Sequence, residues 1–134
     1  INLLLPVEVF GGGARHAGRV FLGNTEVGDG KRFKSRGYIP LTGRANYRCM
    51  SVVLNLDLEG QPEQVLDPNI SYRILSEGMR NGLFSGKKLD NYLNPQEQDF
   101  FHARRIVDAI DQAEKIAGRA RLYYQQLVGC EVRK

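Results

Sequence analysis

The sequence predicts a mainly α-helical fold with one short extended segment. Four segments combine apolar residues at helical spacing with residues typical of helix ends: 44–54, 68–81, 99–109 and 113–129. Residues 33–42 instead alternate between apolar and polar side chains, which is typical of a half-buried strand. The chain has no internal repeat and no low-complexity tract, so we expect a single domain over residues 1–134.

Composition limits the possible functions but does not identify one. A chain of 134 residues is long enough for one modest core. Its net charge of +4 favours polyanionic partners, among them nucleic acid, anionic lipid and the bacterial cell wall. No stretch approaches the ~20 apolar residues that cross a membrane. Cys49 and Cys130 lie apart, without metal-site spacing, so we expect no metal or other cofactor and two free thiols, with a disulfide as the alternative.

The N-terminal region precedes the first predicted element. Residues 1–10 are apolar around one acid, Glu8, and three glycines at 11–13 interrupt whatever structure precedes them. Residues 14–30 read as a surface loop. The apolar opening is too short for a signal-peptide core. Because residue 1 is Ile rather than Met, we expect a processed product, a truncated product or a fragment.

The extended segment follows a predicted turn at residues 28–30. Phe33, Ile39 and Leu41 define one apolar face of the segment. The opposite face is polar, basic and aromatic, and carries Lys34, Arg36, Tyr38, Pro40 and Thr42. Such a face suits the wall of a groove, and it equally suits an edge strand with solvated cations. Thr42 stands where the N-cap of the next helix is expected.

The two central helices have clear sequence signals. For residues 44–54 the predicted buried side chains are Tyr47, Met50, Val53 and Leu54, beside Cys49 or Val52. Residues 57–64 read as a polar connection. Asp67 and Pro68 form a typical helix start, and Gly82 a typical stop. The buried stripe of this second helix is predicted to hold Ile70, Ile74, Leu75 and Met79.

Two further helices are predicted after a loop at residues 85–98. The helix at 99–109 offers the apolar side chains Phe100, Phe101, Ile106 and Val107. Asp111 and Glu114 have the spacing of a capping box that begins the last helix. One face of that helix carries Ala113, Ile116, Ala117, Ala120, Tyr124 and Leu127, and the helix is expected to end near Gly129.

Several sequence blocks follow one another along residues 18–127. The most specific block is 28–47, which contains Gly-Asp-Gly, Arg-Gly and Leu-Thr-Gly-Arg-Ala-Asn-Tyr. The other blocks are 22–30, 57–63, 66–68, 78–89 and 103–118. In this order the blocks resemble the family 19 glycoside hydrolases, most closely the phage endolysin and bacterial chitinase-like branch. The resemblance implies a lysozyme-like helical domain with a short extended segment at the cleft. It also implies an enzyme that inverts configuration while hydrolysing β-1,4 bonds of peptidoglycan or chitin, and we expect a monomer.

The resemblance also implies a site. Glycosidases use two carboxyl groups, one as acid and one as base or nucleophile. Glu8 falls at about the family's spacing for the general base, and Thr42 matches the hydroxyl that positions the attacking water. Positions at the cleft floor correspond to Arg36, Tyr38, Arg44 and Asn46. Towards the C-terminus, Arg104 and Arg105 match residues that orient a catalytic carboxylate, and Asp108 matches a sugar or water contact.

The chain also departs from the family pattern. The general acid of the family follows a histidine on a helix upstream of every block matched here, and neither His16 nor His102 precedes a glutamate. The family's glutamine two residues before the threonine is Pro40, and an asparagine is replaced by Asp108. Three hypotheses follow: a cell-wall lytic enzyme acting at the bacterial wall or outside the cell, a degenerate glycan-binding relic, and a weaker polyanion binder. The third would use Lys31, Arg32, Lys34 and Arg36, but it has few stacking partners, so we expect no nucleic-acid partner.

Overall fold

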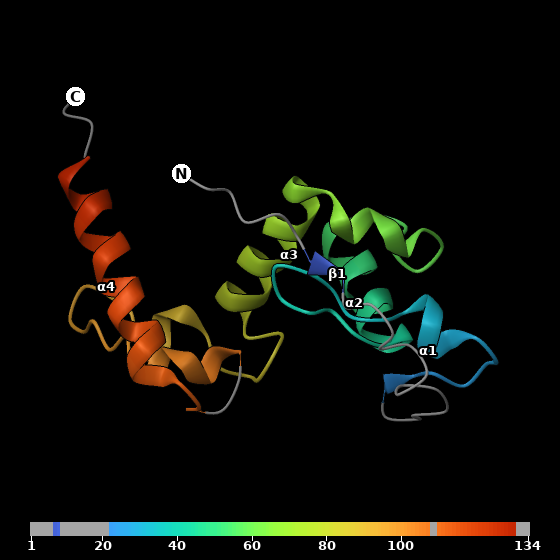
Figure 1. Ribbon diagram of the computed structural model, residues 1–134, viewed down its shortest axis with the longest axis horizontal. Coiled ribbons are helices and arrows are strands. Elements are labelled where there is room, and N and C mark those ends of the chain that lie inside the picture. Colours follow the sequence, from blue (N-terminus) through green and yellow to red (C-terminus); the bar gives the residue numbers. More distant parts are fainter. Residues whose placement is uncertain (1–6, 9–21, 108–109, 131–134) are drawn as a thin grey trace. The chain divides into compact units, whose positions relative to one another are not determined.

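The computed structural model describes residues 7–8, 22–107 and 110–130, and over these residues the chain is mainly helical, as predicted (Figure 1). The chain divides into two compact units, Ile1–Glu77 and Gly78–Lys134. Each unit is described by itself, and the expected single domain stays a prediction. In the described ranges, no helix has both the length and the apolar character that a membrane span requires.

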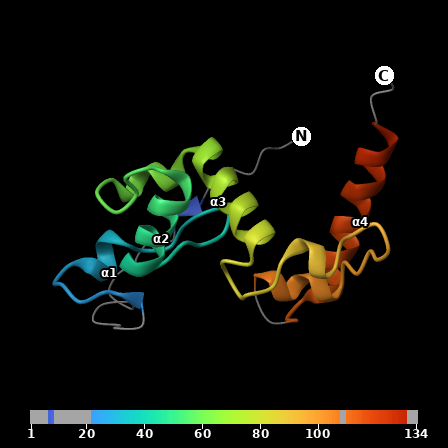
Figure 2. The same cartoon turned by 180° about the vertical axis from the view of Figure 1, so that it is seen from behind.

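The first unit contains the two strands and most of the long helices. Its elements are β1 (Val7–Glu8), α1 (Asp29–Arg32), β2 (Arg36–Gly37), α2 (Arg44–Leu54), the 3-10 helix η3 (Pro62–Leu66) and the start of α3 (Pro68–Asn81). Strands β1 and β2 pair antiparallel, with Val7 opposite Gly37 and Glu8 opposite Arg36. Figures 1 and 2 show β2 and the turn after it running beside α2.

The predicted extended segment is much shorter than its alternating pattern suggested. Only Arg36–Gly37 is a strand, and Arg36 also forms an isolated antiparallel bridge with Leu41. Gly37 has a φ of 99°, a left-handed value that favours glycine and turns the chain back on itself. Arg36, expected on the polar face, is 3% exposed, so the solvated-edge alternative is wrong for this residue. The prediction failed because a tight turn, and not an extended strand, connects positions 36 and 41.

Helix α2 has the predicted bounds but not the predicted cap. Gly43, with a φ of 89°, occupies the N-cap and makes no side-chain cap bond. The cap is instead supplied from a distance, because the backbone N–H of Arg44 donates to Oδ1 of the buried Asn24 at 3.0 Å. The N-cap prediction for Thr42 is therefore wrong. The buried residues of α2 are Tyr47, Met50 and Leu54, whereas Cys49, Val52 and Val53 are exposed.

The segment between α2 and α3 is more ordered than the predicted polar connection. Leu58 and Val65 are fully buried, and Val65 belongs to η3. Ser51 on α2 holds the turn, since its hydroxyl accepts hydrogen bonds from the backbone N–H groups of Leu58 and Glu59. Asp67 then caps α3 as predicted, because its Oδ1 accepts hydrogen bonds from the N–H groups of the next two helical residues after Pro68.

Helix α3 continues across the boundary into the second unit and ends where predicted. Ile74 is buried, while Ile70, Leu75 and Met79 are half-buried. Gly82, with a φ of 72°, follows the last helical residue. A side chain at Gly78 would overlap the ring of Phe84, so this helix end and the following turn pack closely.

The second unit contains two 3-10 helices, η4 (Leu89–Asn91) and η5 (His102–Ile106), and the long helix α4 (Ala113–Gly129). The α-helix predicted at 99–109 is wrong. Asp99 instead accepts hydrogen bonds from the backbone N–H and the ring of His102, and the short helix that follows uses i to i+3 bonds. Residues 108–109 lie outside the described residues.

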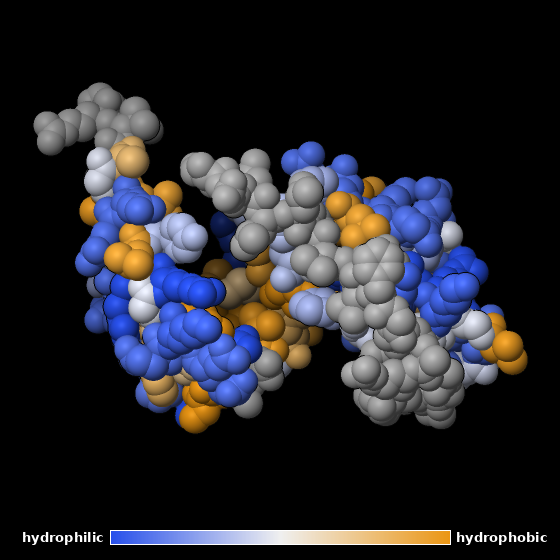
Figure 3. Space-filling view, in the orientation of Figure 1, coloured by the Kyte–Doolittle hydropathy of each residue, from blue (hydrophilic) through white to orange (hydrophobic). Residues whose placement is uncertain are grey.

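Helix α4 ends at the predicted residue, but it begins without the predicted capping box. Gln112 occupies the N-cap with a φ of 53° and no side-chain cap bond. The buried residues of α4 are the small Ala113 and Ala117. The remaining apolar side chains of the predicted face are exposed or, for Ala120, half-buried, and Figure 3 shows apolar side chains on the surface of this helix.

Candidate functional site

An aromatic pair lies at the centre of the block that carries the strongest resemblance. The rings of Phe33 and Tyr47 lie 5.3 Å apart, and both side chains are fully buried. Two arginines flank them: the Arg44 guanidinium lies 4.9 Å from the Phe33 centroid, and that of Arg36 lies 5.9 Å from the Tyr47 centroid. Tyr47 is therefore a core residue, as the helical spacing predicted. The block folds around its own aromatic residues, which fixes the two arginines.

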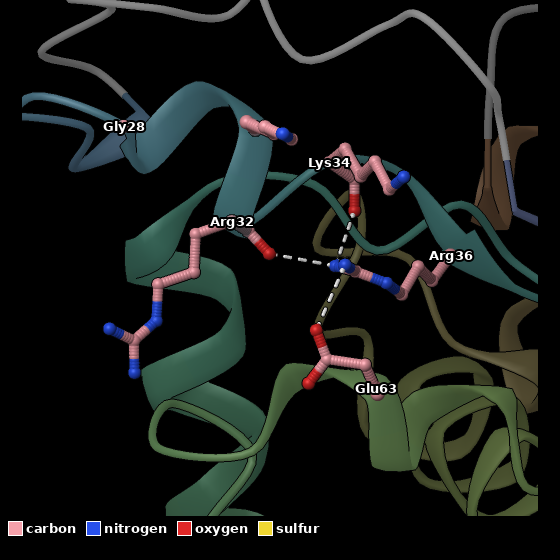
Figure 4. Close-up of a pocket in the computed structure, with 6 residues that line it drawn as sticks. Gly28, Arg32, Lys34, Arg36 and Glu63 are labelled. Atoms are coloured by element: carbon pink, nitrogen blue, oxygen red, sulfur yellow. Dashed lines mark hydrogen bonds and ion pairs between the residues drawn. The ribbon is translucent and has the colours of Figure 1, made fainter.

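Arg36 is held by three neutral oxygen acceptors and one carboxylate. Its Nη1 donates to the backbone carbonyls of Arg32 at 2.8 Å and Lys34 at 3.4 Å, and to the Tyr47 hydroxyl at 3.0 Å. Its Nη2 lies 3.5 Å from a carboxylate oxygen of Glu63, a side chain that is largely exposed. Figure 4 shows the guanidinium between the Arg32 and Lys34 carbonyls, with Glu63 on the opposite side. These contacts keep a buried cation in one orientation.

Arg44, by contrast, is paired with three carboxylates. It binds Asp29 with Nε at 3.0 Å and Nη2 at 2.5 Å, and it also contacts Glu26 at 2.8 Å and Glu59 at 3.2 Å. Hydrogen bonding to Asp29 raises the pKa of Arg44, and the same bond lowers the pKa of Asp29. The Asp29 carboxylate also accepts backbone bonds from residues 25 and 26, so its role is structural.

Arg48 extends this ion-pair network. Its Nε and Nη2 both lie 2.8 Å from oxygens of Glu59. These bonds from Arg48, with a further contribution from Arg44, lower the pKa of Glu59 to about 2. The network therefore connects α1, α2 and the turn before η3. Arg44 was predicted as a substrate contact, and the structure places it inside this network.

Thr42 lies beside a second hydroxyl. Its Oγ1 donates to the Pro40 carbonyl at 3.1 Å and lies 2.6 Å from the Ser35 hydroxyl. With the Thr42 proton committed to Pro40, Ser35 donates to Thr42, and one Oγ1 lone pair remains for a water molecule. Asn46 supports the same segment, because its Nδ2 donates to the Thr42 carbonyl at 2.7 Å.

Tyr38 directly follows β2, and Glu8 belongs to the strand that pairs with β2. The Tyr38 backbone N–H donates to the buried Ser71 hydroxyl at 2.7 Å, which anchors the turn after β2 to α3. A Cβ at Gly37 would come within 3.1 Å of Ser71 and Val65, so this approach requires glycine. The backbone of Glu8 pairs with Arg36 from the other side.

The structure brings together six of the nine predicted site residues. Five of the six were predicted in one block, and Glu8 joins them through β1. The residues in the first unit are Glu8, Arg36, Tyr38, Thr42, Arg44 and Asn46. Arg104 and Arg105 belong to the second unit, and Asp108 lies outside the described residues.

The two arginines of the second unit have separate local roles. Nε of Arg104 donates to the Asp111 carbonyl at 3.2 Å, which ties η5 to the start of α4. Arg105 is exposed, and its carbonyl accepts a hydrogen bond from Ser85.

An open pocket of about 340 Å³ lies beside Arg36 in the first unit (Figure 4). Its lining residues are Gly28, Lys31, Arg32, Lys34, Arg36 and Glu63. Sequence reasoning noted the four cations as a weak polyanion candidate but did not predict a cavity. It also missed Glu63, which lies within a segment interpreted as a polar connection.

Other features of the described ranges bear on cofactors. No group of His, Cys, Asp and Glu side chains in these ranges is arranged to hold a metal ion. Cys49 and Cys130 are free and exposed, which confirms the prediction of two free thiols; the alternative disulfide between them is not formed.

The sequence did not predict the ion-pair network, although the acids Glu26, Asp29 and Glu59 were visible in the matched blocks.

The candidate site therefore consists of a rigid aromatic and ionic scaffold, a hydroxyl pair and a basic pocket.

Comparison of the chain with protein-family models, with curated proteins and with solved structures finds no match.

Proposed function

We propose that the chain is a glycoside hydrolase-like, cell-wall lytic domain that cleaves β-1,4 bonds of peptidoglycan or chitin by an inverting acid/base mechanism. One observation carries the proposal. Arg36 pairs through its backbone with Glu8 on one side and with Leu41, the neighbour of Thr42, on the other. Two strand spacings, about 10 Å, therefore separate the backbone of the proposed base from that of the proposed water-binding segment.

In this proposal Glu8 removes a proton from the attacking water, and Thr42 orients that water. The hydrogen bonds of Thr42 suit this role, because its committed proton leaves an oxygen lone pair to accept a hydrogen from water. The bond from Asn46 to the Thr42 carbonyl keeps the segment in place. The residue that protonates the leaving oxygen is not assigned within this chain.

The arginines of the first unit take supporting roles in the proposal. Arg44 has its guanidinium engaged by three carboxylates, which favours a scaffold role over the direct sugar contact expected from its position. Tyr38 is half-buried on the turn after β2, where its position suits a sugar contact. Arg104 and Arg105 keep their predicted role of orienting a catalytic carboxylate, and Asp108 keeps its predicted sugar or water contact, as part of the proposal.

A second candidate is a glycan-binding protein without catalysis. It is favoured by Pro40, which is exposed at the position where the resembling family carries an amide side chain. Proline offers no donor, so a sugar contact of that family has no equivalent here.

The test is hydrolysis by the whole chain and by Glu8→Gln. Each protein is incubated with purified peptidoglycan and with chitin oligosaccharides, and new reducing ends and soluble fragments are measured by mass spectrometry. We expect cleavage by the unmodified chain and a loss of at least about a hundredfold in Glu8→Gln, since a general base contributes that much or more. Glu97→Gln, which removes an exposed acid in the second unit, is the matched control and should cleave normally.

The outcomes separate the candidates. Equal cleavage by Glu8→Gln and the unmodified chain would reject Glu8 as the base. Retention on either polymer without cleavage would support the glycan-binding alternative. The expected monomeric state stays a prediction, and sedimentation of the same preparation checks it.

A further inference from the structure

Four arginines of the first unit fall into two groups with different partners. Arg44 and Arg48 contact carboxylates, and these partners neutralise their charge. Arg32 donates instead to the backbone carbonyls of Glu59 and Gly60, at 3.2 and 3.3 Å. Arg36 donates to two carbonyls and also pairs with the Glu63 carboxylate at 3.5 Å. Carbonyl dipoles orient a guanidinium without cancelling its charge, so Arg32 contributes a positive field.

That second group lines the pocket beside β2. Lys31, which is exposed, and Lys34, which is half-buried, add two ammonium groups to the same lining. Among the described lining residues, four cations accompany one carboxylate, that of Glu63. Figure 4 shows Arg32, Lys34 and Arg36 coming from α1, the following loop and β2, so separate segments converge on the space. A concave wall lined with one sign of charge concentrates the field within it.

We infer that this pocket binds a carboxylate of an anionic wall glycan. This inference rests on the proposed function, because it takes the ligand to be a cell-wall polymer, and it selects peptidoglycan over chitin, which is uncharged. The volume of about 340 Å³ is near the lower end for small-molecule sites, so it suits one substituent of a polymer rather than a length of chain.

The lining also favours a carboxylate over a nucleic acid. Glu63 contributes a negative charge to the pocket, which penalises a strongly charged phosphate polymer more than a single carboxylate. Among the lining residues that the structure describes there is no aromatic side chain on which a base could stack. The long, rotatable lysine side chains suit a carboxylate whose position varies along an irregular polymer.

The experiment measures binding to three polymers in parallel. The probes are purified sacculi, the same sacculi with their carboxyl groups amidated, and chitin. The proteins are the unmodified chain, the double variant Lys31→Gln with Lys34→Gln, and a control with Lys87→Gln and Lys115→Gln. The control removes the same charge from two exposed positions of the second unit. Lys31→Gln alone serves as a further variant, because Lys31 is exposed and we expect its replacement to leave the fold intact.

We expect the unmodified chain to bind intact sacculi about tenfold more tightly than amidated sacculi, since two or three exposed charge contacts account for about that factor. The pocket double variant should lose this preference and bind both preparations alike. Lys31→Gln alone should lose about threefold. The control should keep the preference to within about twofold.

Three results would overturn the inference: an unchanged preference in the pocket double variant, an equal loss in the control, or tighter pocket-dependent binding to a single-stranded oligonucleotide than to sacculi.

Glu8→Gln separates this inference from the proposed function. If neither that variant nor the unmodified chain cleaves glycan, but both keep the carboxylate preference, the hydrolase proposal fails and the pocket stands. If cleavage occurs and neither amidation of the sacculi nor Lys31→Gln changes it, the inference of a carboxylate-binding pocket is rejected and the hydrolase proposal is kept.

Discussion

Helices α2 and α4 have equally clear boundaries in the sequence but are stabilised very differently. Both have the predicted bounds. Helix α2 buries Tyr47, Met50 and Leu54, and its first residue enters the ion-pair network. Helix α4 buries two alanines and exposes larger apolar side chains. The comparison teaches that local spacing identifies a helix, whereas the partners of each face are decided by distant segments.

The largest effect expected from this comparison comes from one tyrosine in each helix. Tyr47 is 0% exposed and Tyr123 is 66% exposed. Tyr47→Ala should lower the free energy of unfolding by about 3 to 5 kcal/mol, because it empties the centre of the aromatic pair. Tyr123→Ala should lower it by less than about 0.5 kcal/mol. Urea unfolding followed by circular dichroism measures both, and similar values for the two variants would remove the contrast between the helices.

Residue 36 illustrates why the sequence predicted the helices better than the site. Helix bounds depend on local signals such as Asp67 before Pro68 and Gly82 after α3, and these were read correctly. The burial of Arg36 depends on carbonyls of a neighbouring turn and on the Tyr47 hydroxyl, which alternation alone does not reveal. The same reasoning explains the wrong cap, since Asn24 reaches α2 from twenty residues away.

The pocket and the network were missed for a related reason. Each acid and base was visible as a charged residue, but charge patterns do not state which cation meets a carboxylate and which meets a carbonyl. In the second unit, the helix predicted at 99–109 failed because the Asp99 side chain satisfies the backbone of His102 and a short 3-10 helix follows. Long-range and side-chain-to-backbone bonds therefore account for most of the corrections.

The next largest effect tests the ionic part of the α2 anchor. Asp29→Asn keeps the shape and the acceptor of residue 29 but removes the charge that binds Arg44. We expect a loss of about 3 kcal/mol in the free energy of unfolding, because a nearly buried pair is broken. Glu26→Gln changes a largely exposed carboxylate on the same guanidinium and should cost less than about 1 kcal/mol. Equal costs for the two variants would mean that burial does not decide the strength of this network.

A pH titration sharpens the same contrast with a smaller effect. The pKa of Glu59 falls from 4.5 to about 2 in the folded chain, chiefly through its hydrogen bonds to Arg48. A carboxyl with a lowered folded pKa stabilises the fold above its unfolded pKa, and that contribution is lost as the pH falls from about 4.5 to 2. Between pH 6 and pH 3 the loss should be about 2 kcal/mol.

The variant Glu59→Gln isolates this contribution. Glu59→Gln should be less stable than the unmodified chain at pH 6, and this deficit should shrink by about 2 kcal/mol between pH 6 and pH 3, because the variant has no proton to bind at residue 59. Urea unfolding at pH 6, 4 and 3 measures the difference, with Glu97→Gln as an exposed control. A constant difference between Glu59→Gln and the unmodified chain at all three pH values would show that Glu59 is not selectively stabilised as a carboxylate.

The smallest effect is expected on α4, where it tests the other side of the comparison. Leu127 is 71% exposed and Ala117 is 0% exposed on the same helix. Leu127→Gln should leave the free energy of unfolding within about 0.5 kcal/mol, since little apolar contact is lost. Ala117→Gln should cost about 1 to 3 kcal/mol, because a longer polar side chain must enter a filled space. If Leu127→Gln costs as much as Ala117→Gln, the exposed face of α4 is covered in solution. Helices α2 and α4 would then both be buried on one face, and they would differ only in the partner that buries them.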